Sequence, residues 1–248
     1  MNFFKNFAFA AALACAAASI STAEAADAIG KVAAFKGFPT ASGTGGARDL
    51  AKGSELFEGD TIKASNGGNV QIILNDDTKL VVGPASQLVL ETYLLRNEKT
   101  AKKVAVKALR GYFRFITGNS AKSAYAITTP SATIGIRGTG LDIRVRNITL
   151  AAVVVGAIRL EGTNEQAVDA EAGCGVAEAG GGGTNAQLLG GRAKANRLRQ
   201  DFPWIFNQTA LAAQFQLPTE SCNIIVPKSF GEGGSQEPND PSGRQSPD

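Results

Sequence analysis

Apolar and polar residues alternate in short runs between about residue 29 and residue 176. Side chains of a β-strand point to opposite faces in turn, so each run predicts a strand with one buried face. Turn-forming residues separate the runs, and no helical period lies between them. Among the clearest runs are Val70/Ile72/Leu74, Val104/Val106/Ala108, Ile134/Ile136 and Leu141/Ile143/Val145. This spacing predicts an all-β domain.

The most regular part of the pattern covers residues 125–145. Two alternating runs flank Arg137-Gly138-Thr139, and a glycine between such runs indicates a bend or a close approach of two backbones. The glycine cluster at residues 135–140 also suggests a phosphate-binding loop. It lacks the Gly-Lys-Ser/Thr ending, however, and a strand follows it instead of a helix N-terminus. We therefore interpret the cluster as backbone turns.

The first 25 residues follow a different pattern. Lys5 precedes an apolar, alanine-rich run over residues 7–20, and Ala23 and Ala25 place small side chains at the two positions that define a cleavage site. This layout is typical of a secretory signal peptide, and the run is too short to span a bilayer comfortably as an uncleaved anchor. We predict cleavage after Ala25 and a periplasmic or secreted protein. No other segment approaches membrane-spanning length, so we expect no transmembrane segment.

Composition divides the remaining chain into four parts. Residues 26–176 carry the β pattern. Residues 177–191 are expected to form a Gly-rich linker, because the consecutive glycines within them disfavour a regular element. Residues 192–226 are expected to form a helical C-terminal appendage. Residues 227–248, rich in Gly, Pro, Ser and charge, are expected to form a disordered tail.

The C-terminal appendage contains one clear helical signal. Pro203 suits the first turn of a helix, where the N–H group that proline lacks is not needed. Trp204, Leu211 and Phe215 then share one face until Pro218 ends the pattern. We expect this stripe to pack on the β domain.

Two cysteines, Cys174 and Cys222, follow the signal peptide, whereas Cys15 lies inside it. In an oxidising compartment an isolated pair predicts a disulfide, which would stabilise the fold by roughly 3–4 kcal/mol in the chain-entropy model. A zinc site is the alternative. Two cysteines in a chain without histidine cannot complete a tetrahedral thiolate–imidazole shell.

The absence of histidine also excludes Ser-His-Asp and Cys-His catalysis and removes the usual general base near neutral pH. The formal net charge of +3 is spread along the chain and is too weak to indicate a nucleic-acid partner. A basic run over residues 192–199 could bind anionic lipid or nucleic acid. It has no interleaved aromatic residues, so a solvated helix face is favoured.

Two pairs of carboxylates could bind a metal ion or take part in catalysis. Asp76 and Asp77 could supply oxygen ligands to calcium, but six or more oxygens must converge on that ion and Asn-Asp-Asp is a common hairpin turn. Asp60 and Glu91 could form a pair for glycoside cleavage, although no pattern places them together. We therefore expect no catalytic residue, metal or cofactor, and keep a carboxylate-dependent hydrolase as a third hypothesis.

The β region resembles the FecR domain family over residues 53–176. Motifs of the family occur in its order, from Gly59-Asp60-Thr61-Ile62 and Pro84-Ala85-Ser86 through Leu109-Arg110-Gly111 and Thr129-Pro130-Ser131 to Arg137-Gly138-Thr139 and Val155-Gly156-Ala157. Thr-Pro followed by Arg-Gly-Thr is the most specific of these motifs. The chain departs from the family at Asp77, where glycine is favoured, at Leu141, where an aromatic is common, and at Cys174, near the terminal Gly-Gln.

The resemblance implies an extracytoplasmic module of short antiparallel or solenoid-like strands, without enzymatic activity or cofactor. Its motif residues are expected to be structural: Gly59, Asp60, Gly111, Thr129, Pro130, Arg137, Gly138 and Thr139. The family's namesakes are membrane-spanning regulators that relay the occupancy of an outer-membrane receptor to a cytoplasmic sigma factor. This chain lacks their cytoplasmic helical region and transmembrane helix, so we do not expect it to relay a signal across the membrane itself.

We therefore expect a binding or scaffold module for a protein or glycan of the cell envelope. Sheet edges, together with Tyr112 and Tyr125 as exposed side chains, are the expected contact points, for instance by strand addition. The alternative is a soluble periplasmic component of envelope signalling, linked to sigma-factor or receptor regulation.

Overall fold

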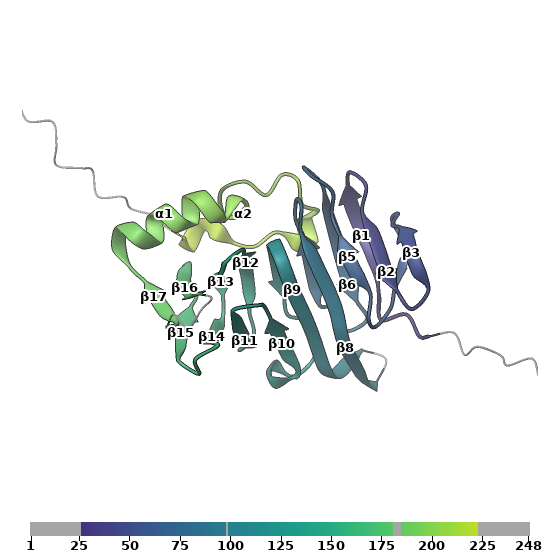
Figure 1. Ribbon diagram of the computed structural model, residues 1–248, viewed down its shortest axis with the longest axis horizontal. Coiled ribbons are helices and arrows are strands. Elements are labelled where there is room, and N and C mark those ends of the chain that lie inside the picture. The colour runs from purple at the N-terminus through teal and green to yellow at the C-terminus, as the bar shows by residue number, and fades with distance from the viewer. Residues whose placement is uncertain (1–25, 98, 181–184, 223–248) are drawn as a thin grey trace, which may run out of the picture.

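The computed structural model describes residues 26–97, 99–180 and 185–222, and Figure 1 shows them as a β-rich body with short helices along one side. The signal peptide predicted over residues 1–25 and the tail predicted over residues 227–248 lie outside the described residues. Within the described ranges, no helix is long and apolar enough to cross a membrane.

Strands account for most of the described chain. They are β1 (Gly30–Lys36), β2 (Thr40–Gly43), β3 (Gly46–Asp49), β4 (Glu55–Leu56), β5 (Thr61–Lys63), β6 (Asn69–Leu74), β7 (Lys79–Val82), β8 (Gln87–Asn97), β9 (Thr100–Ile116), β10 (Tyr125–Thr128), β11 (Ala132–Ile136), β12 (Gly140–Val145), β13 (Ile148–Val155), β14 (Ala157–Gly162), β15 (Ala167–Glu171), β16 (Gly175–Gly180) and β17 (Gln187–Leu189). The helices are α1 (Gly191–Asp201) and α2 (Pro203–Phe206), with 3-10 turns at Lys122–Ala124, Ala213–Phe215 and Thr219–Ser221.

The strands form two sheets that share the long strand β9. The first sheet has the order β4-β1-β6-β7-β9-β12-β13-β16-β17. The second has the order β3-β2-β5-β8-β9-β10-β11-β14-β15. Among these pairings only β9 with β10 is parallel. The all-β prediction is therefore confirmed. Figure 1 shows β1–β3 at one end of the molecule, β14–β17 at the other and β8–β9 between them.

The facing sides of the two sheets enclose one continuous apolar core. Ile72 and Phe115 enter it from the first sheet, and Ile62 and Ile134 enter it from the second. Their side chains are almost completely buried, and each such burial stabilises the fold by roughly 1.5–3 kcal/mol. The apolar positions of the four predicted runs named above are all buried in this core, as the alternating pattern requires.

Strand β9 belongs to both sheets because it bends at Gly111. Before the bend it pairs with β8 and β10, and from Gly111 onward it pairs with β12. Gly111 has a φ of 111°, and a Cβ atom there would lie 2.0 Å from Ser86 Oγ. The Tyr112 N–H group donates a hydrogen bond of 2.8 Å to the same Ser86 oxygen, which holds the bend. Glycine is required at this position both for its φ angle and for its missing side chain.

Residues 191–222, here called the C-terminal cover, form a third layer on the outer face of the first sheet. One cluster packs Leu198, Phe202 and Ile205 of the cover against apolar residues of β13 and β16. A second cluster packs Trp204 and Phe215, together with Leu211, against Val81 of β7. Figure 1 shows α1 and α2 next to β16, β13 and β12 in this view.

The helix predicted from Pro203 to Pro218 is wrong beyond Phe206. The Asn207 backbone is extended, and its side-chain oxygen accepts hydrogen bonds from the N–H and hydroxyl groups of Thr209 at 3.0 and 2.7 Å. Such a local turn competes with the helical hydrogen-bond pattern. The apolar stripe nevertheless packs on the β domain as expected. Trp204 lies in α2, and the residues that follow place Leu211 and Phe215 against the same sheet.

The linker predicted over residues 177–191 is also partly wrong. Strand β16 continues to Gly180, and β17 occupies residues 187–189. Strand β13 on one side and β17 on the other supply β16 with backbone partners, and the small side chains of Ala177 and Ala179 fit the core. Tertiary pairing therefore overrides a composition that does not favour strands.

Replacing Gly111 should test the bend in β9. We expect Gly111→Ala to lower the free energy of unfolding by about 2–4 kcal/mol, because the φ angle is strained and the methyl group meets Ser86. Gly45→Ala is the matched control, since a Cβ atom there meets no other atom within 4 Å. Denaturant unfolding measures both values, and equal stability of the two variants would contradict this account of the bend.

Candidate functional site: an arginine-lined cleft

The Thr129 and Ser131 side chains support the turn between β10 and β11. Thr129 Oγ1 accepts hydrogen bonds from the N–H groups of Ser131 at 3.3 Å and Ala132 at 2.9 Å. It also lies 2.7 Å from Thr149 Oγ1, which is 2.7 Å from Ser131 Oγ. Pro130 is exposed at the tip of this turn. The arrangement fits the expected structural role of the Thr-Pro-Ser motif.

The Arg137-Gly138-Thr139 segment forms the turn between β11 and β12. Gly138 has a φ of 74°, and Thr139 Oγ1 donates a hydrogen bond of 2.7 Å to the Ala157 carbonyl. The exposed Arg137 forms a salt bridge with Asp169 at 3.7 Å. Strand β12 follows the glycine cluster, as the interpretation as backbone turns expects.

Asp60 and Glu91 do not form a catalytic pair. Both carboxylate oxygens of the buried Asp60 accept hydrogen bonds from Arg48, and one also accepts from the Phe57 N–H group at 2.8 Å. The Leu90 N–H group donates to the Asp60 carbonyl, so Glu91 follows the residue opposite Asp60. Successive residues of a strand point to opposite faces. Glu91 is exposed, whereas the Asp60 carboxylate is committed to Arg48.

Asp76 and Asp77 occupy the turn between β6 and β7. Asp76 is buried, and one oxygen accepts hydrogen bonds from Ser120 Oγ at 2.7 Å and from the Tyr125 hydroxyl at 3.0 Å. Tyr125, expected to be exposed, is therefore buried, because its hydroxyl serves this internal network. Burial is also the main cause that raises the pKa of Tyr125. The described residues contain no cluster of three or more His, Cys, Asp or Glu side chains suited to a metal ion.

A cleft with a volume of about 720 Å³ opens where β9 passes from one sheet to the other. Its charged lining consists of Arg110, Arg144, Arg146, Arg197 and Asp201. Its remaining walls are largely apolar and include Pro84, Ala85, Tyr112, Ile148 and Leu150. This volume lies within the range of small-molecule sites, and a few polar groups on apolar walls are typical of them.

Arg144 is the central charged residue of the cleft. It lies on the outer face of β12 and is only 5% exposed. Its guanidinium carbon stacks 4.0 Å above the ring of the cross-strand partner Tyr112. One hydrogen bond runs from Nη1 to the Val145 carbonyl at 3.3 Å, and Nε lies 3.9 Å from Asp201 Oδ1. Arg144 Nε thus has no hydrogen-bond partner in the described part of the chain.

Two exposed arginines flank the same cross-strand pair at the mouth of the cleft. Val145 of β12 pairs with Gly111 of β9. Arg146 comes directly after Val145, and Arg110 comes directly before Gly111. Neither arginine has an ion-pair partner among the residues that the structure describes. Like charges close together across strands are destabilising. The fold therefore maintains an uncompensated positive charge at this place.

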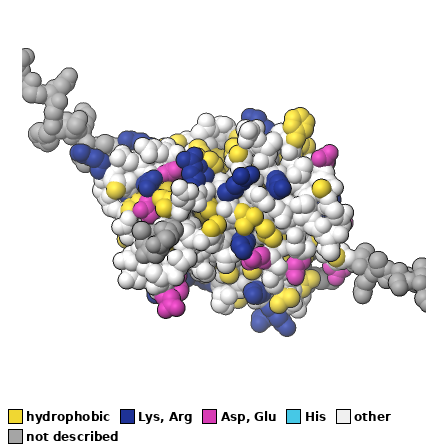
Figure 2. Space-filling view, in the orientation of Figure 1, with side chains coloured by type: hydrophobic (Ala, Val, Ile, Leu, Met, Phe, Trp, Pro, Cys, Tyr) yellow, Lys and Arg dark blue, Asp and Glu magenta, His cyan; other side chains and the backbone are white. Residues whose placement is uncertain are grey.

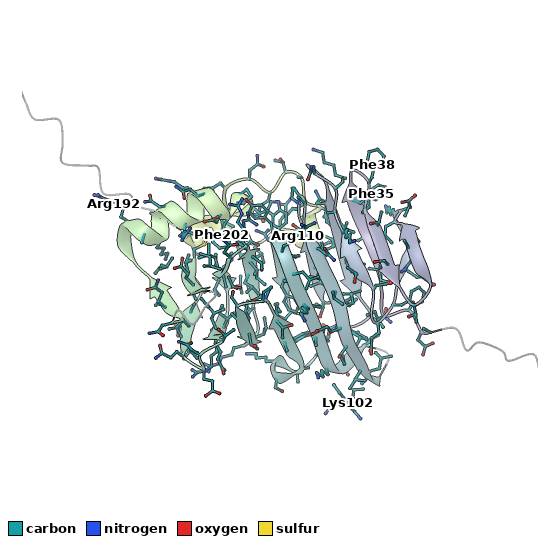
Figure 3. All side chains as sticks on the ribbon, viewed as in Figure 1. Phe35, Phe38, Lys102, Arg110, Arg192 and Phe202 are labelled. Carbon is teal, nitrogen blue, oxygen red and sulfur yellow. A yellow bond between two sulfur atoms is a disulfide. The ribbon has the colours of Figure 1, made fainter. Side chains whose placement is uncertain are left out.

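The C-terminal cover supplies the opposite wall of the cleft. Arg197 of α1 forms salt bridges with Asp201 at 3.5 Å and with Glu178 of β16 at 3.0 Å. Asp201 is therefore shared between Arg197 and Arg144. Figure 3 shows Arg110 beside the cover and Arg192 at the far end of α1. Figure 2 shows several Lys and Arg side chains on this face, with fewer acidic ones among them.

Two features fix the cover to the first sheet. The predicted disulfide is present: Cys174, between β15 and β16, is bonded to Cys222 at the end of the cover, with a Cα–Cα distance of 5.0 Å. The second feature is a buried ion pair. Arg114 donates to both oxygens of its cross-strand partner Asp142, at 2.6 and 2.8 Å.

The buried Arg114 also reaches into the cover. Its Nη1 group donates to Gln208 Oε1 and, at 3.2 Å, to the Phe215 carbonyl. Its guanidinium lies 5.7 Å from the Trp204 ring. Burial raises the pKa of Asp142, while the hydrogen bonds and charge of Arg114 act in the opposite direction. A single arginine thus connects the first sheet to three residues of the cover.

The family comparison identifies part of the chain. Residues 60–159 match the family described as FecR protein, and this segment contains every predicted motif residue except Gly59. No curated protein sequence matches the chain.

Two solved structures are similar in part. Both are crystal structures, at 1.65 and 2.50 Å resolution, of a proposed anti-sigma factor from Parabacteroides distasonis ATCC 8503. They share 12% sequence identity with this chain, with TM-scores of 0.42 and 0.43. The aligned part covers 52% of this chain and 58% of that protein, less than two thirds of its length.

The buried ion pair can be tested by a double-mutant cycle. Arg114→Leu alone leaves the Asp142 carboxylate buried without its partner and should lower the free energy of unfolding by about 3–5 kcal/mol. The double variant Arg114→Leu/Asp142→Leu should be more stable than either single variant, because neither charge then remains unpaired. Urea unfolding measures the cycle. Losses that simply add would show that the two side chains do not act as a pair.

Proposed function

We propose that this protein, whose residues 60–159 form a FecR domain, is an exported, non-enzymatic module that binds a protein or glycan of the cell envelope through the arginine-lined cleft. The observation that carries the proposal is the pair of exposed arginines at the mouth of the cleft. Arg110 and Arg146 have no ion-pair partner among the described residues, whereas Arg144 behind them is 5% exposed and lies 3.9 Å from Asp201. A bound anion would supply a partner to the two exposed guanidinium groups.

The carboxylates considered from the sequence favour binding over hydrolysis. Asp60 is held by Arg48, and Asp76 accepts hydrogen bonds from Ser120 and Tyr125. A general acid or base needs an oxygen within reach of a substrate. These two carboxylates instead accept hydrogen bonds from groups inside the protein.

The cleft is a better contact site than the sheet edges. The terminal strands of the two sheets are β3, β4, β15 and β17, which contain only 4, 2, 5 and 3 residues. Short edge strands offer few backbone groups to an added strand. A concave site with apolar walls and several guanidinium groups offers more contact area and more hydrogen-bond donors.

In-cell photo-cross-linking can test the binding role. A photoreactive amino acid in place of the exposed Asn147, at the cleft, should give a specific adduct in growing cells. The same substitution at the exposed Lys52, which is not part of the cleft, is the control. The adduct should be lost when Arg110→Gln and Arg146→Gln are added. Identical adducts from both positions, or none from position 147, would contradict the proposal.

The FecR domain favours a second candidate function, a periplasmic component of envelope signalling. If this candidate is correct, deletion of the gene should change the transcript levels of a sigma-factor regulon. The gene encoding Arg110→Gln/Arg146→Gln should reproduce the change, whereas the gene encoding Arg192→Gln should complement the deletion. Unchanged sigma-factor transcripts after deletion would exclude the signalling role and leave the binding role standing.

A further inference from the structure

We propose that the ligand of the arginine-lined cleft is an acidic saccharide, that is, a sugar chain bearing carboxylate groups. This inference rests on the proposed binding function and specifies its ligand class. It follows from three properties of the cleft: the guanidinium groups of Arg110 and Arg146, which have no ion-pair partner among the described residues, the single carboxylate in its lining and its apolar walls.

The guanidinium groups favour an anionic ligand. Arg110 and Arg146 are exposed at the mouth of the cleft without ion-pair partners among the described residues, and the buried Arg144 lies behind them, 3.9 Å from Asp201. A planar guanidinium matches a carboxylate in a two-bond geometry, and such charge-assisted bonds are about twice as strong as neutral ones. Because the arginines lie at different depths, a ligand with acidic groups at intervals can engage more than one of them.

The carboxylate of Asp201, a hydrogen-bond acceptor, favours a ligand that also carries hydroxyl groups. This carboxylate lies 3.9 Å from Arg144 Nε and 3.5 Å from Arg197 Nη1, so both of these contacts are long. Next to a bare phosphate or a purely acidic ligand it would be repulsive. A sugar hydroxyl, in contrast, can donate a hydrogen bond to this oxygen while the acidic group of the sugar meets Arg144.

The walls favour a ring-shaped ligand over an isolated ion. Pro84, Ala85, Ile148 and Leu150 line the cleft, and its volume of about 720 Å³ far exceeds that of a single small anion. Sugar rings combine apolar faces with polar edges, which matches apolar walls that carry a few charged groups. An acidic peptide could also pair with the arginines, and its backbone N–H groups could donate to Asp201. We favour the saccharide because its rings present apolar faces to the apolar walls of the cleft.

Calorimetric titration of the full chain with oligogalacturonate tests the proposal. Trigalacturonate should bind, and the uncharged galactose trimer should not. Arg110→Gln and Arg146→Gln should each weaken binding about tenfold, the effect of losing one charge-assisted hydrogen bond. Both side chains are exposed, so the variants should fold normally. Arg192→Gln is the matched control, because Arg192 is exposed on α1 and does not line the cleft.

Asp201→Asn separates a saccharide from other anions. If a sugar hydroxyl donates to Asp201, this variant should bind trigalacturonate no more tightly than the native protein, while any weak binding of inorganic phosphate should become tighter. Binding of phosphate or of a glutamate trimer as tight as that of trigalacturonate would overturn the saccharide class. So would trigalacturonate binding that persists in Arg110→Gln/Arg146→Gln.

The two proposals can fail separately. If Asn147 gives its specific adduct in cells but trigalacturonate does not bind, the saccharide assignment is wrong and the binding function stands. If neither the adduct nor binding is observed, both proposals are wrong. If trigalacturonate binds and the arginine variants weaken it as stated, the cleft is a site for acidic saccharides.

Discussion

The buried ion pair between Arg114 and Asp142 is the constraint on which the outer half of the structure depends. Both residues lie on the outer face of the first sheet, where two unshielded charges would be costly to bury. The C-terminal cover makes their burial possible, because Gln208 and the Phe215 carbonyl accept the remaining Arg114 donor. The position of the cover is therefore determined by the sheet beneath it, and α1 is held beside the cleft.

The cleft arises from the same outer row of side chains. Along β9 and β12, the Arg114–Asp142 pair is followed by the pair of Tyr112 and Arg144. The cover contacts both pairs, but in different ways: Gln208 and the Phe215 carbonyl accept hydrogen bonds from Arg114, whereas Asp201 lies 3.9 Å from Arg144 Nε. Two neighbouring arginines thus have different environments: Arg114 has a full set of protein partners, whereas Arg144 has a stacked ring and one weak hydrogen bond.

The sequence predicted the parts of this structure that depend on local pattern. Alternation identified the runs that became β6 and β12, and the isolated cysteines identified the disulfide. The pattern Leu-Asp-Ile-Arg-Val, however, reads as a strand with one solvated face, so it gave no sign that Asp142 and Arg144 are buried. Their burial comes from the cover, a segment distant in sequence whose loop conformation depends on side-chain turns such as that of Asn207. Tyr125 was misjudged for the same reason, because its partner Asp76 lies in a remote turn.

The bend at Gly111 has a mechanical consequence. Arg110 lies just before it, on the part of β9 that pairs in the second sheet, whereas Arg144 belongs to the first sheet alone. A molecule held by both would bridge the line along which the two sheets separate. Part of its binding energy would then resist the splaying of one sheet from the other. A ligand in the cleft would therefore make both sheets more rigid. Amide hydrogen exchange would become slower in both sheets, including at positions far from the ligand.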